Sequence, residues 1–271
     1  MRECMRLLFI AFAATACLTS LFAEENRSVP ITNWISTPAS KLSEKYWTGA
    51  NWSRIEWVVE TENGQVFARR DAKHSSTNLP FEIKQASADQ RGIRHEVKVA
   101  DGWLAGWNAG EWGGSVWWFS PDGNTSQRVS KHQVIGFYPV ADGVLAPAGL
   151  AHLGISEGKL IKFAKANGQW SPREVANLQA APQAASLDKD DTLIIATTER
   201  LLRVKPSGDV SVLLPTTFWG TLYPNSMVID AQGNVWIGMR HGITKVGKKG
   251  GGYEVLWLVP DKSYLEVKSR N

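Results

Sequence analysis

The chain is poor in cysteine and in long apolar runs, and each shortage excludes a class of protein. Its only cysteines, Cys4 and Cys17, lie near the start of the 271 residues, so the rest of the chain can form no disulfide and offers no thiol nucleophile. Beyond residue 22, no stretch approaches the roughly 20 apolar residues of a membrane-spanning helix. The net charge is +4 without a dense run of Lys and Arg, which disfavours nucleic-acid binding. The sequence also lacks a G-x-S-x-G motif and a P-loop.

The first 23 residues have the pattern of a secretory signal peptide. Arg2 and Arg6 precede an apolar stretch over residues 7–22, and Ala23 provides a small residue at the cleavage position. We therefore expect this segment to be removed, which leaves a cysteine-free mature chain that is secreted or periplasmic and has no membrane span. The alternative is a lipoprotein that is cleaved within "ATAC" and lipidated at Cys17.

A four-strand unit recurs along the remainder of the chain. Residues 225–259 contain four runs of alternating apolar residues, rich in β-branched and aromatic side chains and separated by turns. Comparable hairpins turn at intervals of 38 to 48 residues, at Gly64, Gly102, Gly143, Asp191 and Gly233. A period of ~40–45 residues with four strands is typical of a β-propeller blade.

This period predicts an all-β fold, a β-propeller of four-stranded antiparallel blades over residues 51–271. A single blade is a small sheet with two apolar faces, which are buried only when neighbouring blades pack together. Five blades are readable in the sequence. Residues 24–50 form either an N-terminal extension or a closing strand, and their pairing with residues 255–271 would give a sixth blade.

One unit resembles a known repeat. The stretch "DAQGNVWIGMRHGITKV", residues 230–246, resembles the propeller repeats in sensor regions of two-component regulators, whose units run D-x-x-G-N-h-W-I-G-x-x-x-G-h. The match is good over this unit and loose over the others. It implies the fold and not an activity, because propellers carry many unrelated functions.

A second resemblance leads to a metal-dependent alternative. The stretch "YPNSMVIDAQGNVWIG", residues 223–238, is similar to a segment of the gluconolactonase-like propellers, which bind a divalent metal near the propeller axis. That resemblance implies Glu56 and Asn225 as ligands of Ca²⁺ or Mg²⁺. Asn225 stands where the family has an aspartate, and Ser226 replaces a glycine, so only one carboxylate remains. Propellers also include metal-assisted lyases, in which His152 or His241 would serve as a general base.

The candidate binding residues lie in loops that propellers bring to one face. In propellers generally, the loops between second and third strands share one end of the molecule with the connections that enter the first strands. The residues on the connections that enter the first strands include Glu56, Arg94, Gln183, Tyr223 and Asn225. The predicted ligand-binding set is Arg69, Trp107, Glu111, Trp112, His152, Arg200, Trp219, Arg240 and His241. Together they would form a cationic funnel with aromatic walls, which suits an anionic small molecule, an acidic peptide or a glycan.

Tryptophan is concentrated in the segment "DGWLAGWNAGEWGGSVWWFSPDG", residues 101–123. Alignment of the blades predicts that Trp117 packs in the core. Trp103 and Trp118 align with polar or charged residues of sister blades, which leaves two interpretations. They fill the wedge between blades or cover an N-terminal strand, or they form a flat platform for a sugar or another apolar face.

The function that follows is an exported, non-catalytic recognition module. It would bind a small anionic ligand, a glycan or a protein partner on the loop face, with no catalytic residues and no resident cofactor, and we expect it to be a monomer that does not bind nucleic acid. The alternative is a metal-dependent lactonase-like hydrolase or lyase with the metal at the propeller axis.

Overall fold

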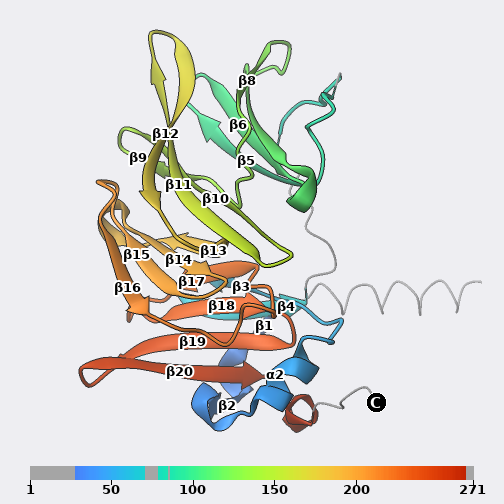
Figure 1. Ribbon diagram of the computed structural model, residues 1–271, viewed down its shortest axis with the longest axis vertical. Coiled ribbons are helices and arrows are strands. Elements are labelled where there is room, and N and C mark those ends of the chain that lie inside the picture. The colour runs from blue at the N-terminus through green and yellow to red at the C-terminus, as the bar shows by residue number, and fades with distance from the viewer. Residues whose placement is uncertain (1–27, 71–78, 85, 267–271) are drawn as a thin grey trace, which may run out of the picture.

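The computed structural model describes residues 28–70, 79–84 and 86–266 (Figure 1). The predicted signal peptide, residues 1–23, and Cys17 lie outside the described residues. Within them, the chain folds into five antiparallel sheets that follow one another in sequence. The predicted fold class, an all-β propeller with five blades, is confirmed.

Each blade is named here by its strands. Blade 1 contains β1 (Val29–Pro30), β3 (Trp57–Glu62) and β4 (Gln65–Arg70). Blade 2 contains β5 (Ile93–Val99), β6 (Gly102–Asn108), β7 (Gly114–Phe119) and β8 (Ser126–Ser130). Blade 3 contains β9 (Tyr138–Val140), β10 (Gly143–His152), β11 (Ile155–Ala166) and β12 (Gln169–Asn177). Blade 4 contains β13 (Pro182–Leu187), β14 (Leu193–Thr197), β15 (Leu201–Val204) and β16 (Val210–Leu214). Blade 5 contains β17 (Ser226–Ile229), β18 (Val235–Met239), β19 (Gly242–Lys249), β20 (Gly252–Val259) and β2 (Ile35–Pro38).

The segment before residue 51 contributes edge strands to two blades. β1 pairs with β4 of blade 1, and β2 pairs with β20 at the outer edge of blade 5. The helix α2 (Glu44–Ala50) follows β2 in the chain and precedes β3. Its first turn is capped by the Ser43 hydroxyl, which accepts a hydrogen bond from the Tyr46 N–H. This segment therefore fastens the first blade to the last one and does not build a sixth.

Short 3-10 turns complete the described elements. They are η1 (Ile31–Asn33), η2 (Ala39–Lys41), η3 (Gly110–Trp112), η4 (Lys189–Asp191) and η5 (Lys262–Leu265). None of the described helices has both the length and the apolar character needed to cross a membrane.

Apolar side chains fill the junctions between successive blades. The junctions contain Leu104 and Phe163 (blades 2 and 3), Leu145 and Leu202 (blades 3 and 4), Ile194 and Ile237 (blades 4 and 5), and Trp57 and Trp236 (blades 5 and 1). No hydrophobic cluster of the described residues joins blade 1 to blade 2. The described blades therefore run as an arc from blade 2, at one end of the long axis, through blades 3, 4 and 5, with blade 1 beside the first strands of blade 5 (Figure 1).

Close backbone approach explains one glycine at the junction of blades 5 and 1. A Cβ on Gly238 would lie 2.4 Å from the carbonyl oxygen of Trp57. Because real Cβ atoms do not approach oxygen so closely, only glycine lets β18 lie this near to β3.

Most tryptophans of blade 2 pack against other hydrophobic side chains. Trp103 and Trp117 are half-buried against the cluster that contains Phe119, and Trp118 packs on the core shared with blade 3. The wedge-filling interpretation thus agrees with the packing of Trp118, whereas Trp103 packs on a cluster formed by residues of blade 2 and of the segment that precedes it.

Candidate functional site

The loop face is the end of the blades that carries the connections between second and third strands, together with the segments entering the first strands. The structure brings most of the predicted residues to it, in contacts that link neighbouring blades. Glu111 pairs with His152, Arg200 donates to Gln179, and Arg240 pairs with Glu56. Most of these residues gather at two places, the junction of blades 2 and 3 and the junction of blades 5 and 1.

At the junction of blades 2 and 3, η3 presents an exposed tryptophan. His152 Nε2 lies 2.9 Å from Glu111 Oε2, which ties the end of β10 to η3. The next residue, Trp112, is 70% exposed. It lines an open groove of about 690 Å³ together with Arg91, Gly92, Ile93, Asn108, Ala109 and Gly110. This groove combines an indole face, an aliphatic side chain and a guanidinium group.

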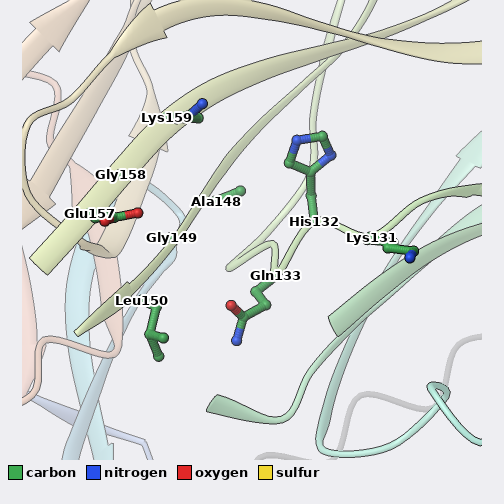
Figure 2. Close-up of a pocket in the computed structure, with 9 residues that line it drawn as sticks. All are labelled: Lys131, His132, Gln133, Ala148, Gly149, Leu150, Glu157, Gly158 and Lys159. Carbon is green, nitrogen blue, oxygen red and sulfur yellow. The ribbon is translucent and has the colours of Figure 1, made fainter. Parts of the chain in front are cut away.

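A smaller cavity of about 220 Å³ lies beside it (Figure 2). His132 and Gln133, from the connection between blades 2 and 3, form one side, and β10 and β11 form the other, where Lys159 lies. The Gln133 amide donates to the Gly110 carbonyl. Burial, followed by the nearby Lys159 ammonium, lowers the pKa of His132, and its Nδ1 is buried without a partner. His132 is therefore neutral at pH 7.

At the junction of blades 5 and 1, Arg240 is the central residue. Its guanidinium donates to the Asn51 carbonyl oxygen at 2.8 Å and to the Asn51 Oδ1 at 3.0 Å, and it lies 3.3 Å from Glu56 Oε1. It also lies over the Tyr223 ring, 4.5 Å from the centroid. Tyr223 is 51% exposed, so the pair presents an aromatic surface backed by a positive charge.

His241 has a structural role. Its Nε2 donates to the Tyr264 carbonyl at 2.8 Å, and its Nδ1 is buried without a partner. Burial lowers its pKa. The ring packs between Tyr46 and Tyr264, so it fastens the C-terminal turn η5 to blade 5. The prediction that His241 contacts a ligand is corrected to this role.

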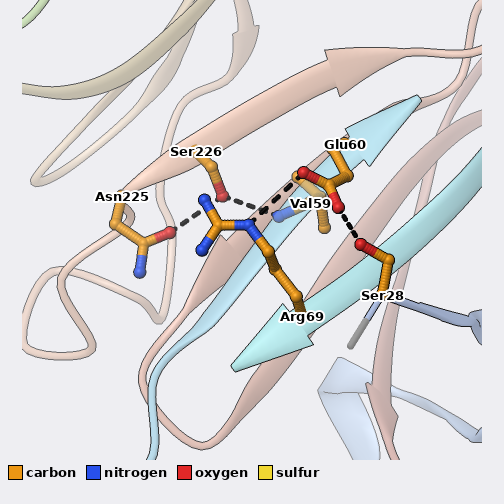
Figure 3. A network of polar contacts seen from close by, with 6 residues as sticks. All are labelled: Ser28, Val59, Glu60, Arg69, Asn225 and Ser226. Carbon is orange, nitrogen blue, oxygen red and sulfur yellow. Dashed lines mark hydrogen bonds and ion pairs between the residues drawn. The ribbon is translucent and has the colours of Figure 1, made fainter. Parts of the chain in front are cut away.

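Arg69 joins a polar network between blades 1 and 5 (Figure 3). Its guanidinium lies between Asn225 and Glu60, with Nε 3.3 Å from Glu60 Oε2. The Ser226 hydroxyl donates to Asn225 Oδ1 at 2.8 Å and accepts from the Val59 N–H at 2.9 Å. The network holds the first strand of blade 5 against β3.

The residues implied for a metal do not fit a hard cation in this arrangement. The Glu56 carboxylate is already paired with the Arg240 guanidinium, which would repel the ion. The Asn225 carbonyl oxygen accepts from Ser226. Within the described ranges, no group of three His, Cys, Asp or Glu side chains could hold a metal ion.

Two of the predicted ligand contacts are corrected by burial. Trp107 is 4% exposed and packs against Phe119 in blade 2, and Trp219 is fully buried, with its Nε1 donating to the Thr197 carbonyl at 3.0 Å. Large aromatic side chains contribute most when they are removed from water. Both are core residues. Gln183 likewise turns inward and donates to the Gly220 carbonyl.

Sequence reasoning missed several exposed apolar residues of the loop face. These are Trp52, Ile93, Leu153 and Ile155. Their position in a turn, or at the first residue of a strand, was the only available signal. Leu153 shows it best, because it lies at the tip of the β10–β11 hairpin with a φ of 45°, a conformation unusual for a branched residue.

No protein-family model and no curated protein sequence matches the chain. The described fold is that of a β-propeller repeat protein, and solved structures similar to it are of this kind. The extracellular domain of the putative one component system BT4673 from B. thetaiotaomicron aligns with a TM-score of 0.39 and 12% identity over 59% of this chain and 20% of that one. A gluconolactonase, XC5397 from Xanthomonas campestris, aligns with a TM-score of 0.35 and 16% identity over 54% and 45%. A catalytically inactive virginiamycin B lyase from Staphylococcus aureus aligns with a TM-score of 0.41 and 12% identity over 63% and 57%.

The similar solved structures thus include a sensor-protein domain and a gluconolactonase, the two kinds of propeller that the sequence resembles, with identities of 12% and 16%. The chain spans a fifth of the length of the BT4673 domain and about half of the length of the two enzymes. Nothing about activity follows from alignments at this level.

Proposed function

We propose that the protein is an exported recognition module that binds a protein partner through its loop face. One observation carries the proposal. Of the large hydrophobic side chains that are exposed in the described part of the chain, only Val210 and Val212 lie away from this face. The others are Trp52, Ile93, Trp112, Leu153, Ile155 and Tyr223.

This distribution is not expected of a surface that contacts only water. Single exposed apolar residues are ordinary, but their concentration on one face is typical of an interaction surface. Tryptophan, tyrosine and arginine are also the residues that most often dominate binding energy at protein interfaces. Trp112 and Tyr223, together with Arg91 and Arg240, provide these types at the two ends of the arc.

Charge favours an acidic partner. Three carboxylates, Glu56, Glu60 and Glu111, are each paired with an arginine or a histidine of the loop face. Glu199, exposed beside Arg200, is a loop-face carboxylate with no ion pair among the described residues. Arg70, Arg91 and Arg200 have no carboxylate partner among the described residues. Their guanidinium groups are available to carboxylates brought by a partner.

A large ligand is supported better than a small one. The exposed residues are spread between two ends of the arc, and the groove beside Trp112 is open, whereas sites for small ligands usually enclose most of the ligand. Export is supported by the pattern of residues 1–23. The ion pair of Glu56 with Arg240 supports recognition over the metal-dependent alternative, because it places a cation where that alternative requires a metal ion.

Site-specific photo-crosslinking tests the proposal in the cells that express the protein. A photoreactive residue at Trp112 or Leu153 should give the same discrete protein adduct, whereas the same residue at Asp122 or Gln232, in hairpins at the opposite end of the blades, should not. The double substitution Trp112→Ala with Arg91→Ala should abolish the adduct formed at Leu153. Equal adducts at both ends, or an adduct that survives the double substitution, would exclude the loop face.

Thermal unfolding in the presence of Ca²⁺ or Mg²⁺ tests the enzyme alternative separately. We expect no stabilisation by either ion. Stabilisation that disappears in Glu56→Gln would contradict the recognition proposal and favour the metal-dependent alternative.

A further inference from the structure

A second groove opens at the end of the blades opposite the loop face, where blade 5 meets blade 1. It has a volume of about 550 Å³ and lies beside the hairpin turns at Gly64 and Gln232. The N-terminal residues Pro30 to Ser36 form one wall. We call it the indole groove, because Trp34 and Trp236 both line it.

The floor of the indole groove is apolar. Val66, Leu256 and Leu258 line it with the two indoles, and all belong to the hydrophobic cluster between blades 5 and 1 or pack against it. The groove is thus a place where this core is open to solvent. Apolar surface of this kind gains free energy when a ligand removes it from water.

One cation lies in this apolar setting. Lys245, on β19, is half-buried, and its Nζ lies 4.7 Å from the centroid of the Trp236 ring. No carboxylate within ion-pair distance accompanies it among the described residues, and it makes no hydrogen bond there. A half-buried ammonium is stabilised when an anion pairs with it.

The carboxylate that lines the groove, Asp230, is hydrogen-bonded within its own hairpin. Asp230 Oδ1 accepts from the backbone N–H groups of Gln232 at 3.0 Å and Asn234 at 2.8 Å. Asp230 Oδ2 accepts from the Asn234 side-chain amide and from Trp236 Nε1, both at 2.8 Å. With four donors on it, Asp230 shapes the turn and orients the Trp236 ring, and it forms no ion pair with Lys245 among the described residues.

We propose that the indole groove binds a small monocarboxylate with a flat, apolar body. Its carboxylate would pair with the Lys245 ammonium, and its body would lie on the apolar floor between Trp34 and Trp236. A neutral sugar would leave the ammonium unpaired, and a polar acid such as a uronate would place hydroxyl groups on Leu256 and Leu258. This site is separate from the loop face and does not depend on the function proposed for it.

Calorimetric titration with matched probes tests the proposal. Indole-3-acetate should bind the wild-type protein at least about tenfold more tightly than indole-3-acetamide, which has the same body without the charge. Glucuronate, which has the charge without the apolar body, should bind more weakly than indole-3-acetate. Lys245→Met should abolish the difference between acid and amide, and Lys245→Arg should keep it.

Lys248→Met is the control, because Lys248 is exposed on the same strand and does not line the groove. It should leave the binding of all three probes unchanged, and circular dichroism should show each variant folded. Equal binding of acid and amide, a preference for glucuronate, no binding of any probe, or an acid preference that survives Lys245→Met would each overturn the proposal.

Discussion

Trp112 and Trp219 offer a matched pair of substitutions, because sequence reasoning placed both at the ligand and the structure separates them. Trp219 is fully buried between blades 4 and 5, and its indole N–H is bonded to the Thr197 carbonyl. Trp112 is 70% exposed at the tip of a loop. The change to alanine removes the same atoms in both cases, so the difference in stability measures the environment alone.

The expected magnitudes follow from burial. Trp219→Ala leaves a cavity in the core and an unpaired carbonyl, which should lower the free energy of unfolding by about 3–5 kcal/mol. Trp112→Ala removes little buried surface and should change the same quantity by less than about 0.5 kcal/mol. For a chain of this size, the first change corresponds to a fall of roughly 10 °C in the melting temperature.

Urea unfolding followed by far-ultraviolet circular dichroism measures both values, and it avoids a tryptophan fluorescence signal that the substitutions themselves alter. The measurement also bears on function, since only Trp112→Ala should weaken partner binding while the protein remains folded. A stable Trp219→Ala protein, or a Trp112→Ala protein destabilised by several kcal/mol, would refute the assignment of these residues to core and surface.

Three other perturbations have defined outcomes. Burial lowers the pKa of His241 below the 6.5 of an unperturbed histidine. The unfolded chain therefore binds more protons at this residue, and the free energy of unfolding should fall as the pH drops below about 6.5. Urea midpoints between pH 7.5 and 5.5 should show this fall, and a pH dependence of the midpoint that His241→Gln leaves unchanged would contradict the prediction. Tyr46→Phe removes the hydroxyl that accepts from Trp257 Nε1 at 2.8 Å and donates to the Tyr264 carbonyl at 3.0 Å. It should lower the free energy of unfolding, measured by heat or urea, by about 1–3 kcal/mol; an unchanged value would show that these two hydrogen bonds do not stabilise the fold. Asp230→Ala removes a carboxylate with four hydrogen bonds, and should cost about 2 kcal/mol or more, whereas retained stability would mean that the hairpin forms without it.

The fold was predictable because the propeller signal is local and repeated. Hairpins turning at Gly64, Gly102, Gly143, Asp191 and Gly233 recur every 38 to 48 residues, and each requires only neighbouring residues to be recognised. The edge strands β1 and β2 were not individually predictable. They are short, and each pairs with a strand distant in sequence, so no periodic pattern marks them.

The candidate site was predictable only in part. That Glu111 and Trp112 lie in a loop follows from the chain, and so does the position of Arg240 after a second strand. The sequence could not show that Trp107, five residues before Trp112, points into the core. Exposure depends on which face of a strand meets another blade, and on what a side chain from a distant segment covers.

The amino-acid sequence by itself determined that this protein is built from repeated antiparallel sheets, since each hairpin is specified by turn residues and by alternation along one short segment. That the segment before residue 51 adds edge strands to two of the sheets and builds no sixth one was decided by the tertiary structure. Only the tertiary structure decided which aromatic and charged residues remain available. The pairing of Arg240 with Glu56, the burial of Trp219 and the exposure of Trp112 all depend on how the sheets pack. Hydrogen bonds and burial between residues far apart in the chain carry no local signature, because they arise only when the blades meet.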